Sequence, residues 1–528
     1  MSNKKINIGL PLLFSIAVII GMFVGYKLHS NMPNAKSIFS SGGKNKMGEV
    51  LELVRQRYVD EVNVDSVSEI GIEKVLSSLD PHSVYIPISS LKEINEDLEG
   101  QFEGIGVEFN IIKDSVHILA VLPNGPAFNA GLKIGDRIIA VNDSTAIGIK
   151  DTEQFKKWVK GPSGTEVTLK IQRDKNIIVK KIARGTIPLK SVDASYMLDA
   201  NTGYIRLNRF SGTTYEEFMK SLESLKNQGM KSMILDLRDN GGGILEEAVD
   251  IADEFIGDNK LIVYTQGKNN PRKEYLCKRP GLFEEGKVAI LMNEGSASAS
   301  EVLAGALQDL DRATIIGRRS FGKGLVQEQY TLSDGSALRL TTARYYTPLG
   351  RSIQKSYQNG SDEYNMEIVN RLHNQKQEEK DTAAIQHGKK YKTASGKLLY
   401  GGGGITPDYF IAIDSALFDT SLNRLYAKNT LSNFAYNYYM TNKTALANYK
   451  NSNDFNNQFA LPQNYLSLLM DFVKKDDITL SIKNENSKQF LGNRIKAMIA
   501  RILFGETGYF QVLNRVDPSM KKGLESIR

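Results

Sequence analysis

The sequence predicts an α/β protein, and two stretches carry that prediction. "KSMILDLRDNGGG" leads into "ILEEAVDIADEFI", and "KVAILMNEGSASAS" leads into "EVLAGALQDL". Each stretch is an apolar run, then a turn of small residues, then an amphipathic segment, which is the pattern of βα crossover units on a buried sheet. The chain has 528 residues, enough for several domains of ordinary size.

An uncharged run begins the chain, from Ile6 to Tyr26 after Lys4 and Lys5. As a helix it would reach roughly 31 Å, which matches the hydrocarbon core of a bilayer. The run is long for a cleaved signal peptide, and no clear A-x-A cleavage site follows it. Because the lysines stay cytoplasmic, we expect residues 1–29 to be a cytoplasmic stub and membrane anchor, with the remaining chain on the periplasmic or extracytoplasmic side.

Four further regions follow the anchor. Residues 30–98 are expected to be a polar tether and a helical segment that stops at Asp80-Pro81. Residues 99–185 contain short strands between Gly and Pro turns, with "DTEQFKKWV" as a helix and "GTEVTLKIQR" as a strand. Residues 186–410 hold both βα units, interrupted by the polar stretch "HNQKQEEKDTAAIQHGKKYKTASGK", predicted to be a solvated loop. Residues 411–528 are polar with helical patches such as "NRIKAMIARILF", which indicates a mainly helical accessory region.

Composition excludes several functional classes. The net charge of +7 is the small difference between 67 basic and 60 acidic residues, and no Lys/Arg-rich block contains aromatic residues. We therefore expect no nucleic-acid partner. Cys277 is the only cysteine, so the chain can form no internal disulfide or CxxC metal site, and we take its thiol to be structural. No metal and no cofactor is expected.

The stretch "IIGRRSFGKGLVQ" admits two interpretations. Read as Gly317-x-x-x-x-Gly322-Lys323, it resembles a phosphate-binding loop. Against this, Gly324 stands where the loop needs Ser or Thr for magnesium, and "LVQEQYTL" reads as a strand where the loop needs a helix. The other interpretation makes Lys323 a base that removes a proton from a nucleophile.

A nucleophile for such a base is available in "NEGSASASE", which places Ser296, Ser298 and Ser300 between an apolar strand and a helix. A serine there is exposed beside helix N–H groups that stabilise negative charge, although small residues capping a helix would look the same. A histidine base is also possible, because catalytic triads assemble in space. The chain has five histidines, none in either βα turn: His29, His82, His117, His373 and His387.

Lysine can act as the base if its amine is neutral near pH 7, which requires lowering its pKa by roughly 3 units, or about 4 kcal/mol. The apolar residues around Lys323 could exclude water, although a lone lysine is more often a solvated surface charge. If the segment is a strand, Lys323, Leu325 and Gln327 project on one face, and the Gln327 amide could orient the lysine. The glycines of "DLRDNGGG" could turn N–H groups toward an anion, or form only a flexible turn.

Taken in order from about Leu79 to Asp408, the motifs resemble the carboxyl-terminal processing peptidases, also called tail-specific proteases. The motifs are "LDPHSVY", "GIGV", "LDLRDNGGG", "GSASASE", "GRRSFGKGLVQ", "DGSALRLTTARYYTPLGRSIQ" and "GGGGITPD". The resemblance implies a crotonase-like or Clp-protease-like core and a dyad with Ser298 as nucleophile, Lys323 as base and Gln327 as helper. The implied oxyanion donors are the N–H groups of Ala299 and of Gly242 or Gly243.

Residues about 100 to 185 resemble a PDZ domain, because "GIGV" is followed by "GPAFNAGLKIGDRIIAVN". A PDZ domain captures a chain end by adding it as a strand to a sheet edge. The resemblance places the carboxylate-binding backbone at Gly104, Ile105, Gly106 and Val107.

The expected function is that of a serine endopeptidase of the cell envelope, with an inserted PDZ domain that selects protein substrates by apolar C-terminal tails. One alternative is a catalytically inert PDZ scaffold that binds tails, and another is a protease with a histidine triad built on His82 or His117. Other expected partners are the membrane, through the N-terminal helix, and a second copy of the chain or an adaptor protein. The substrate, the cleavage site and the role of residues 411–528 are not specified by the sequence.

Overall fold

The computed structural model describes residues 46–373, 389–413, 420–474, 480, 482 and 485–528. It divides into two units, Met1–Glu73 and Lys74–Arg528. Helix α2 (Lys46–Arg57) belongs to the first unit, and α3 (Val64–Ser77) runs across the boundary. The predicted anchor at residues 6–26 lies outside the described residues, and no helix within the described ranges is long and apolar enough to cross a membrane.

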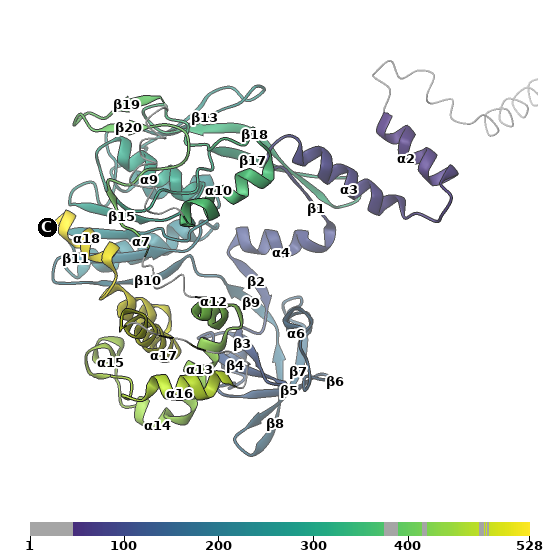
Figure 1. The fold of residues 1–528 in the computed structure, drawn as a ribbon, viewed down its shortest axis with the longest axis vertical. Helices are drawn as coiled ribbons and strands as arrows, with labels where there is room; N and C mark the ends of the chain where they lie inside the picture. The colour runs from purple at the N-terminus through teal and green to yellow at the C-terminus, as the bar shows by residue number, and fades with distance from the viewer. Residues whose placement is uncertain (1–45, 374–388, 414–419, 475–479, 481, 483–484) are drawn as a thin grey trace, which may run out of the picture. The chain divides into compact units, whose positions relative to one another are not determined.

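The catalytic candidates lie around a sheet of six strands in the order β10-β11-β12-β15-β16-β21 (Figure 1). The pair β10 and β11 is antiparallel, and every other pair is parallel, as βα crossovers require. The predicted α/β class is therefore confirmed. The bounds are β10 Val192–Met197, β11 Thr202–Leu207, β12 Ser232–Asp236, β15 Val288–Met292, β16 Thr314–Gly317 and β21 Tyr409–Phe410.

Both faces of this sheet are buried, so its strands are apolar at consecutive positions. Within β12, Met233 and Leu235 pack into the cluster that contains α7 (Thr214–Asn227), α8 (Leu245–Asp253) and α9 (Ala299–Asp309). Ile234 between them packs on the opposite face against α18 (Pro518–Ile527). The last helix of the accessory region thus completes the core of the α/β domain.

A second, five-stranded sheet carries the segment after Lys323. Strand β17 (Leu325–Thr331) pairs with β18 (Ala337–Tyr346), which also pairs with β1 (Val84–Ile86) and β13 (Leu261–Gln266), and β14 (Lys273–Leu276) pairs with β13. Residues 374–388 of the expected solvated loop lie outside the described residues, and at both described ends, residue 373 and residues 389–397, the prediction is wrong. Helix α10 (Ser361–His373) extends to its first residue, and β19 (Lys390–Lys392) forms a hairpin with β20 (Leu398–Tyr400).

The domain predicted to be a PDZ domain is inserted through a two-stranded ribbon. Strands β2 (Gln101–Gly104) and β9 (Gly185–Pro188) pair antiparallel, so the chain enters and leaves the domain at one place. Helix α4 (Ile88–Glu99) precedes the ribbon. The domain sheet has the order β3-β4-β5-β7-β8, with β6 on β5. Its elements are β3 Val107–Ile112, β4 Ser115–Val121, α5 Pro126–Asn129, β5 Arg137–Val141, β6 Ser144–Thr145, α6 Thr152–Val159, β7 Glu166–Arg173 and β8 Asn176–Ala183.

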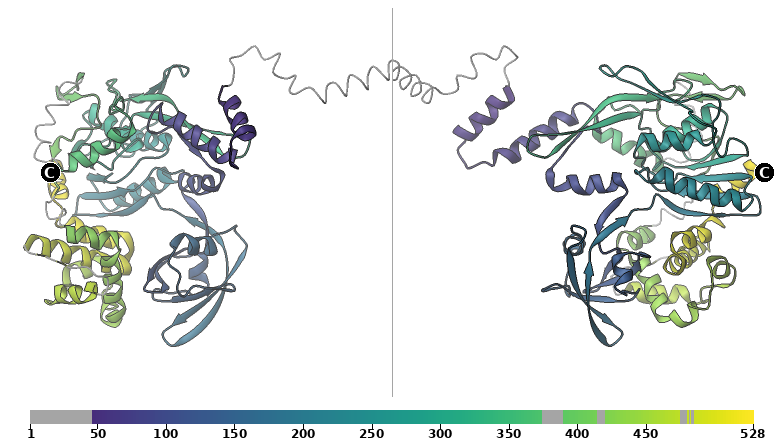
Figure 2. Two further views of the ribbon diagram at one scale, coloured as in Figure 1. Left: turned by 45° about the vertical axis from the view of Figure 1, so that its right-hand side comes forward. Right: turned by 180° about the vertical axis from the view of Figure 1, so that it is seen from behind.

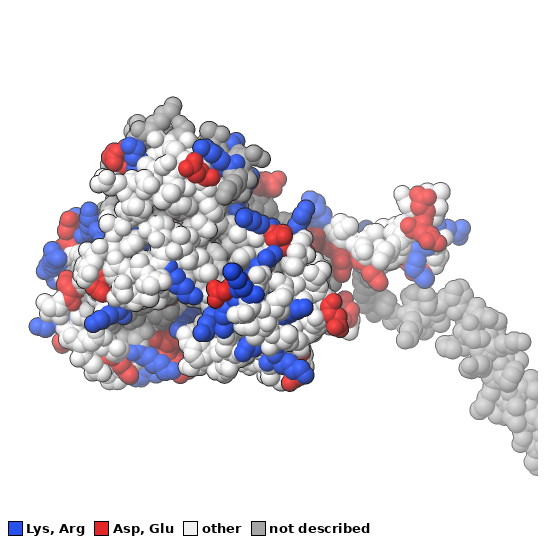
Figure 3. Space-filling view, turned by 90° about the horizontal axis from the view of Figure 1, so that it is seen from below, with Lys and Arg blue, Asp and Glu red and all other residues white. Residues whose placement is uncertain are grey.

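The accessory region folds into helices that have a hydrophobic cluster of their own (Figure 2). They are α12 Thr420–Ala427, α13 Thr430–Thr441, α14 Lys443–Leu446, α15 Ser452–Gln458, α16 Tyr465–Val473 and α17 Glu485–Asn514. Helix α17 bends at Gly505, whose φ of 69° interrupts the helix. On the face drawn in Figure 3, basic and acidic side chains are interspersed, so charges there act through short-range pairs.

Replacing Met520 of α18 with Ala should destabilise the α/β domain. Met520 is 1% exposed, and its removal leaves a cavity against the sheet. We expect the free energy of unfolding to fall by about 2–5 kcal/mol, the usual range for such truncations. The neighbouring exposed Lys521→Ala is the matched control, and urea denaturation is the measurement. Equal stability of both variants would show that α18 is not part of the core.

Candidate functional site

Ser298 lies at the start of α9, in the turn that follows β15. Its backbone has φ 54° and ψ −115°, a conformation that L-residues rarely adopt. Such strain costs about 1–3 kcal/mol and is typical of functional turns. Because the helix begins at Ala299, the N–H groups of its first turn lie beside the Ser298 side chain.

The three hydroxyls of "SASAS" have different environments. Ser296 Oγ donates to the carbonyl of Leu237 at 2.8 Å, and Ser300 Oγ donates to the carbonyl of Asn240 at 2.9 Å. Both serines are fully buried, whereas Ser298 is partly exposed. Ser298 is therefore the one of the three that a substrate can reach.

The carboxylate of Glu301 joins the turn of Ser298 to the turn of Lys323. One oxygen accepts from the Ser298 N–H at 2.9 Å and from the Lys323 N–H at 2.8 Å. The other accepts from the Gly322 N–H at 2.8 Å and from the Ser320 hydroxyl. Burial raises the pKa of Glu301 to about 7, although these four donated hydrogen bonds favour the ionised form. Two segments that lie 25 residues apart are thus held by one side chain.

The side chain of Lys323 is half-buried beside this clamp. Burial, and secondly the nearby Arg339 guanidinium, lower the pKa of Lys323, while Glu301 and Asp80 act in the opposite direction. The direction is the one that a base at neutral pH requires. Within the described ranges, no hydrogen bond joins the Lys323 amine to Ser298 Oγ.

The predicted alternation of Lys323, Leu325 and Gln327 on one strand face is wrong. Strand β17 begins at Leu325, so Lys323 lies in the preceding turn, and the pairing with β18 shifts register between Val326 and Gln327. A bulge of this kind rotates the following side chain relative to a regular strand. The amide of Gln327 donates to the carbonyl of His82 at 3.1 Å.

In the described structure, His82 and His117 have hydrogen-bond partners other than Ser298. His82 Nε2 lies 2.8 Å from the hydroxyl of Tyr364, and burial, with the charge of Lys323 next, lowers the pKa of His82 to about 4. His117 contacts Tyr436 of α13, and His373 ends α10. His29 and His387 lie outside the described residues. No described histidine is hydrogen-bonded to the candidate nucleophile.

The glycine turn after β12 lies directly against Ser298. A Cβ at Gly242 would be 2.7 Å from Ser298 Cβ and 2.9 Å from the Ala299 nitrogen, so only glycine fits there. The Gly242 N–H already donates to Asn240 Oδ1 at 2.9 Å. In the part of the chain that the structure describes, the N–H groups of Ala299 and Gly243 are paired with no protein acceptor. Of the predicted oxyanion donors, these two remain available.

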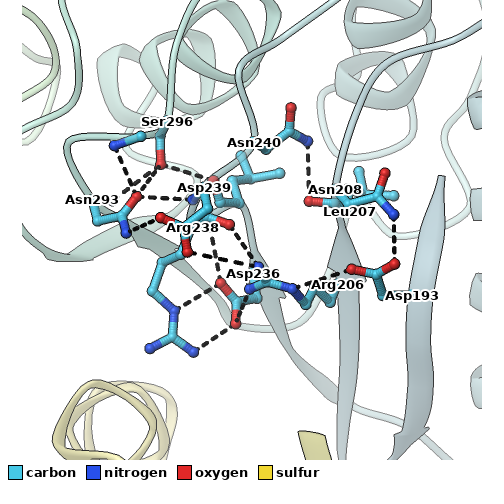
Figure 4. Close-up of polar contacts among 12 residues, drawn as sticks. Asp193, Arg206, Leu207, Asn208, Asp236, Arg238, Asp239, Asn240, Asn293 and Ser296 are labelled. Carbon is cyan, nitrogen blue, oxygen red and sulfur yellow. Dashed lines mark hydrogen bonds and ion pairs between the residues drawn. The ribbon is translucent and has the colours of Figure 1, made fainter. Parts of the chain in front are cut away.

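An ion network beneath this turn sets its position (Figure 4). Asp236 is fully buried at the end of β12 and accepts from Arg238 Nε at 2.9 Å and from Tyr204 OH at 2.8 Å. Burial alone would raise the pKa of Asp236, but the guanidinium groups of Arg238 and Arg206 outweigh it and hold the pKa well below its usual range. Because the carboxylate stays charged, the turn that follows is anchored from below.

The four backbone positions predicted to bind a carboxylate line one groove. Gly104 ends β2, Val107 begins β3, and between them Gly106 has a φ of 75°. The groove encloses about 660 Å³ beside the exposed edge of β3. Apolar and basic side chains line it, among them Ile94, Leu98, Phe102, Phe109, Val159, Lys156, Lys160 and Arg339, together with the acidic residues Glu93, Glu96 and Asp97. This geometry fits an extended apolar chain end.

Comparisons with known proteins show the family to which the chain belongs. Residues 201–363 match peptidase family S41, and residues 117–173 match the PDZ domain family. A carboxy-terminal-processing protease of Bartonella bacilliformis is 35% identical over 352 residues, which cover 64% of this chain and 80% of that protein. The chain belongs to the carboxy-terminal processing protease family. It is therefore a serine-type peptidase with a PDZ domain, and the predicted family is confirmed.

Two further proteins are similar to this chain. The carboxy-terminal processing protease CtpB of Bacillus subtilis is 34% identical over 316 residues, covering 59% of this chain and 65% of CtpB. The solved photosystem II D1 C-terminal processing protease is 28% identical, with a TM-score of 0.35 over 59% of this chain and 84% of that chain. Residues 421–505 of the present chain, which lie in the accessory region, match a protein family of unknown function, DUF8443.

Three further residues belong to the site but were not predicted from the sequence: Glu301, Tyr345 and Asp80. The hydroxyl of Tyr345 donates to the carbonyls of Ser298 and Lys323. Asp80 accepts from the Ser83 hydroxyl at 2.6 Å and from Thr341 of β18 at 3.1 Å, and so holds the "DPHS" turn against this strand. The position of Glu301 three residues after a helix N-cap was the available signal, because such a glutamate accepts backbone N–H groups.

Replacing Glu301 with Gln should reduce kcat strongly. Glutamine has one acceptor oxygen, so its NH2 group would face N–H or O–H donors that now bind the carboxylate. We expect kcat to fall about 10²-fold, the effect of misplacing catalytic groups by about 1 Å. The exposed Glu246→Gln of α8 is the matched control. Steady-state kinetics and circular dichroism together test the prediction, and wild-type kcat in Glu301→Gln would contradict it.

Proposed function

We propose that Ser298 and Lys323 form a catalytic dyad that hydrolyses peptide bonds through an acyl-enzyme. The neutral amine of Lys323 takes the Ser298 hydroxyl proton as Oγ attacks the scissile carbonyl carbon. The ammonium gives that proton to the leaving amine as the C–N bond breaks. A water molecule, deprotonated by the same amine, then attacks the ester and releases the acid product and free Ser298.

One observation carries this proposal: Glu301 binds the backbone of both turns, so the hydroxyl and the amine are presented from one rigid support. Within the described ranges the amine of Lys323 is not hydrogen-bonded to Ser298, so it must come closer for catalysis. Gln327 must exchange the His82 carbonyl for the amine to become its helper. Loose geometry in a substrate-free site is common and tightens when substrate binds.

The tetrahedral oxyanion would be stabilised by the N–H groups of Ala299 and Gly243. Ala299 follows Ser298 and Gly243 follows Gly242, which lies against Ser298, and within the described ranges neither N–H group has a protein acceptor. Helix α9 adds the positive end of its dipole at the same point. Preorganised donors of this kind are worth roughly 10²–10³-fold in kcat each.

Substrates would be proteins with apolar C-terminal tails. The terminal carboxylate would bind the N–H groups of Ile105, Gly106 and Val107, and the tail would add to the free edge of β3. Apolar side chains of the tail would enter the groove that Phe109 and Val159 line. We place the enzyme in the cell envelope, anchored by residues 6–26, because the uncharged run there has the length of a membrane span.

An inert scaffold that binds tails is the second candidate. The observation that favours it is that, within the described ranges, no hydrogen bond joins the Lys323 amine to Ser298 Oγ. The two candidates differ in one measurement. A scaffold would leave a tailed substrate uncut, whether or not Ser298 is present, whereas a protease would cut it and lose this activity with the hydroxyl.

Replacing Ser298 or Lys323 with Ala should abolish peptide hydrolysis. We expect kcat to fall about 10³-fold or more for Ser298→Ala, since the nucleophile is gone. For Lys323→Ala the loss of the general base should cost about 10²–10⁴-fold. Cleavage of a tailed peptide, followed by chromatography, measures both.

The control for this pair is His82→Ala, which removes the imidazole but keeps the backbone carbonyl that Gln327 contacts. It should retain activity within about tenfold of wild type, since buried hydrogen bonds of one side chain contribute about 1 kcal/mol. Complete loss in His82→Ala with activity in Lys323→Ala would instead favour a histidine base.

Replacing Arg339 with Gln should move the ascending limb of the kcat–pH profile to higher pH. Removing a nearby cation favours the ammonium form, so the pKa of Lys323 rises and the neutral base appears only at higher pH. The measurement uses saturating peptide, because Arg339 also lines the tail groove. Exposed Arg272→Gln is the matched control, and an unshifted limb in Arg339→Gln would contradict the assignment.

A further inference from the structure

Two C-terminal helices, α13 and α17, contact β3, the strand of the PDZ domain to which the tail would add. Arg501 of α17 donates to Glu108 of β3 at 2.7 Å. Asn110 of the same strand donates to Asn433 of α13 at 2.7 Å. Two helices of the accessory region, residues 411–528, therefore bind one strand.

The contact continues over the next strand and its turn. His117 Nδ1 on β4 lies 3.3 Å from the Tyr436 hydroxyl on α13. A Cβ at Gly135 would lie 2.6 Å from the terminal methyl of Met440, so the helix is seated directly on this turn. Ile134 packs into the hydrophobic cluster of the helices. Polar and apolar contacts together make this a packed interface.

These contacts leave the tail groove open. The side chains of Glu108 and Asn110 contact the helices. The side chains of Val107 and Phe109 line the groove and pack against the PDZ core. One strand therefore serves both purposes, and its pairing with β4 shifts register between Glu108 and Phe109. A tail can therefore bind while the helices stay in place.

The other end of the same region is fixed to the catalytic domain. Asn514, the last residue of α17, donates to the Tyr196 hydroxyl of β10 at 2.8 Å. Asp517 forms an ion pair with Arg238, whose guanidinium also holds Asp236 beneath the oxyanion turn. Helix α17 thus contacts the PDZ domain through Arg501 and the peptidase core through its last turn.

We propose that the accessory region is a brace that sets the distance between the PDZ tail groove and Ser298, and so determines how far from its C-terminus a substrate is cut. This inference rests on the proposed function. An extended tail advances about 3.3 Å per residue, so a shift of the groove by that distance moves the cut by one bond. A fixed brace therefore confines cleavage to a narrow set of bonds counted from the chain end.

The first test removes the contacts from the PDZ side with Glu108→Ala/Asn110→Ala/His117→Ala, which leaves every residue of the helices unchanged. The matched control is Asp143→Ala/Glu166→Ala, two exposed acidic residues of the same domain. Mass spectrometry of products from a peptide with a free apolar tail gives the cut positions. Wild type and control should cut one narrow set, and the triple variant should spread over about three or more neighbouring bonds. An unchanged pattern would overturn the proposal.

The second test locks the brace with Asn110→Cys/Asn433→Cys and a short bifunctional thiol reagent. The one native cysteine, Cys277, is buried and does not compete for the reagent. The cross-linked protein should cut the wild-type bonds at a rate within about threefold of the same variant before cross-linking. Tail binding without cleavage after cross-linking would show that the brace must open, and would sink the proposal.

A substrate with an amidated C-terminus separates this inference from the proposed function. If the amidated peptide is cut as well as the free acid, tail recognition is wrong and the brace proposal falls with it. If the free acid is preferred at least about tenfold while the triple variant keeps the wild-type cut pattern, only the brace proposal is wrong.

Discussion

A buried carboxylate, that of Glu301, holds together the two segments that carry Ser298 and Lys323. Taking an ionised carboxylate out of water costs several kcal/mol unless hydrogen bonds replace its hydration. At Glu301 they come from both turns, including the N–H groups of Ser298 and Lys323. The desolvation cost can be offset only when both turns are in place, so neither turn can shift without the other.

The glycine turn obeys a related constraint. Its position depends on the charged network around Asp236, and Gly242 approaches Ser298 so closely that no side chain would fit. The guanidinium of Arg238 reaches Asp517, just before the last helix. The accessory region therefore holds the segment that leads into the glycine turn and supplies one face of the core. It is a structural part of the enzyme and not an appendage.

The candidate nucleophile shows how much a local sequence pattern can predict and what the structure adds. The sequence placed three serines at the start of a helix, and the family resemblance selected Ser298. The structure gives a physical reason, because Ser296 and Ser300 are buried and hydrogen-bonded while Ser298 is partly exposed in a strained turn. The surroundings of Lys323 were harder to predict. The expected alternation of Lys323, Leu325 and Gln327 on one strand face was wrong, because β17 starts two residues after Lys323 and carries a bulge.

Hydrophobic periodicity, glycine turns and ordered motifs determined the α/β class and the PDZ insertion, and they selected Ser298 and Lys323 as candidates, because these signals are local in the chain. The clamp by Glu301 and the contact of Gln327 with His82 were decided only by tertiary structure. So was the seating of α13 and α17 on the PDZ strands. Each of these contacts joins segments that lie far apart in the sequence, so no local pattern of residues indicates it. A charged or amide side chain meets such a partner only after the chain has folded.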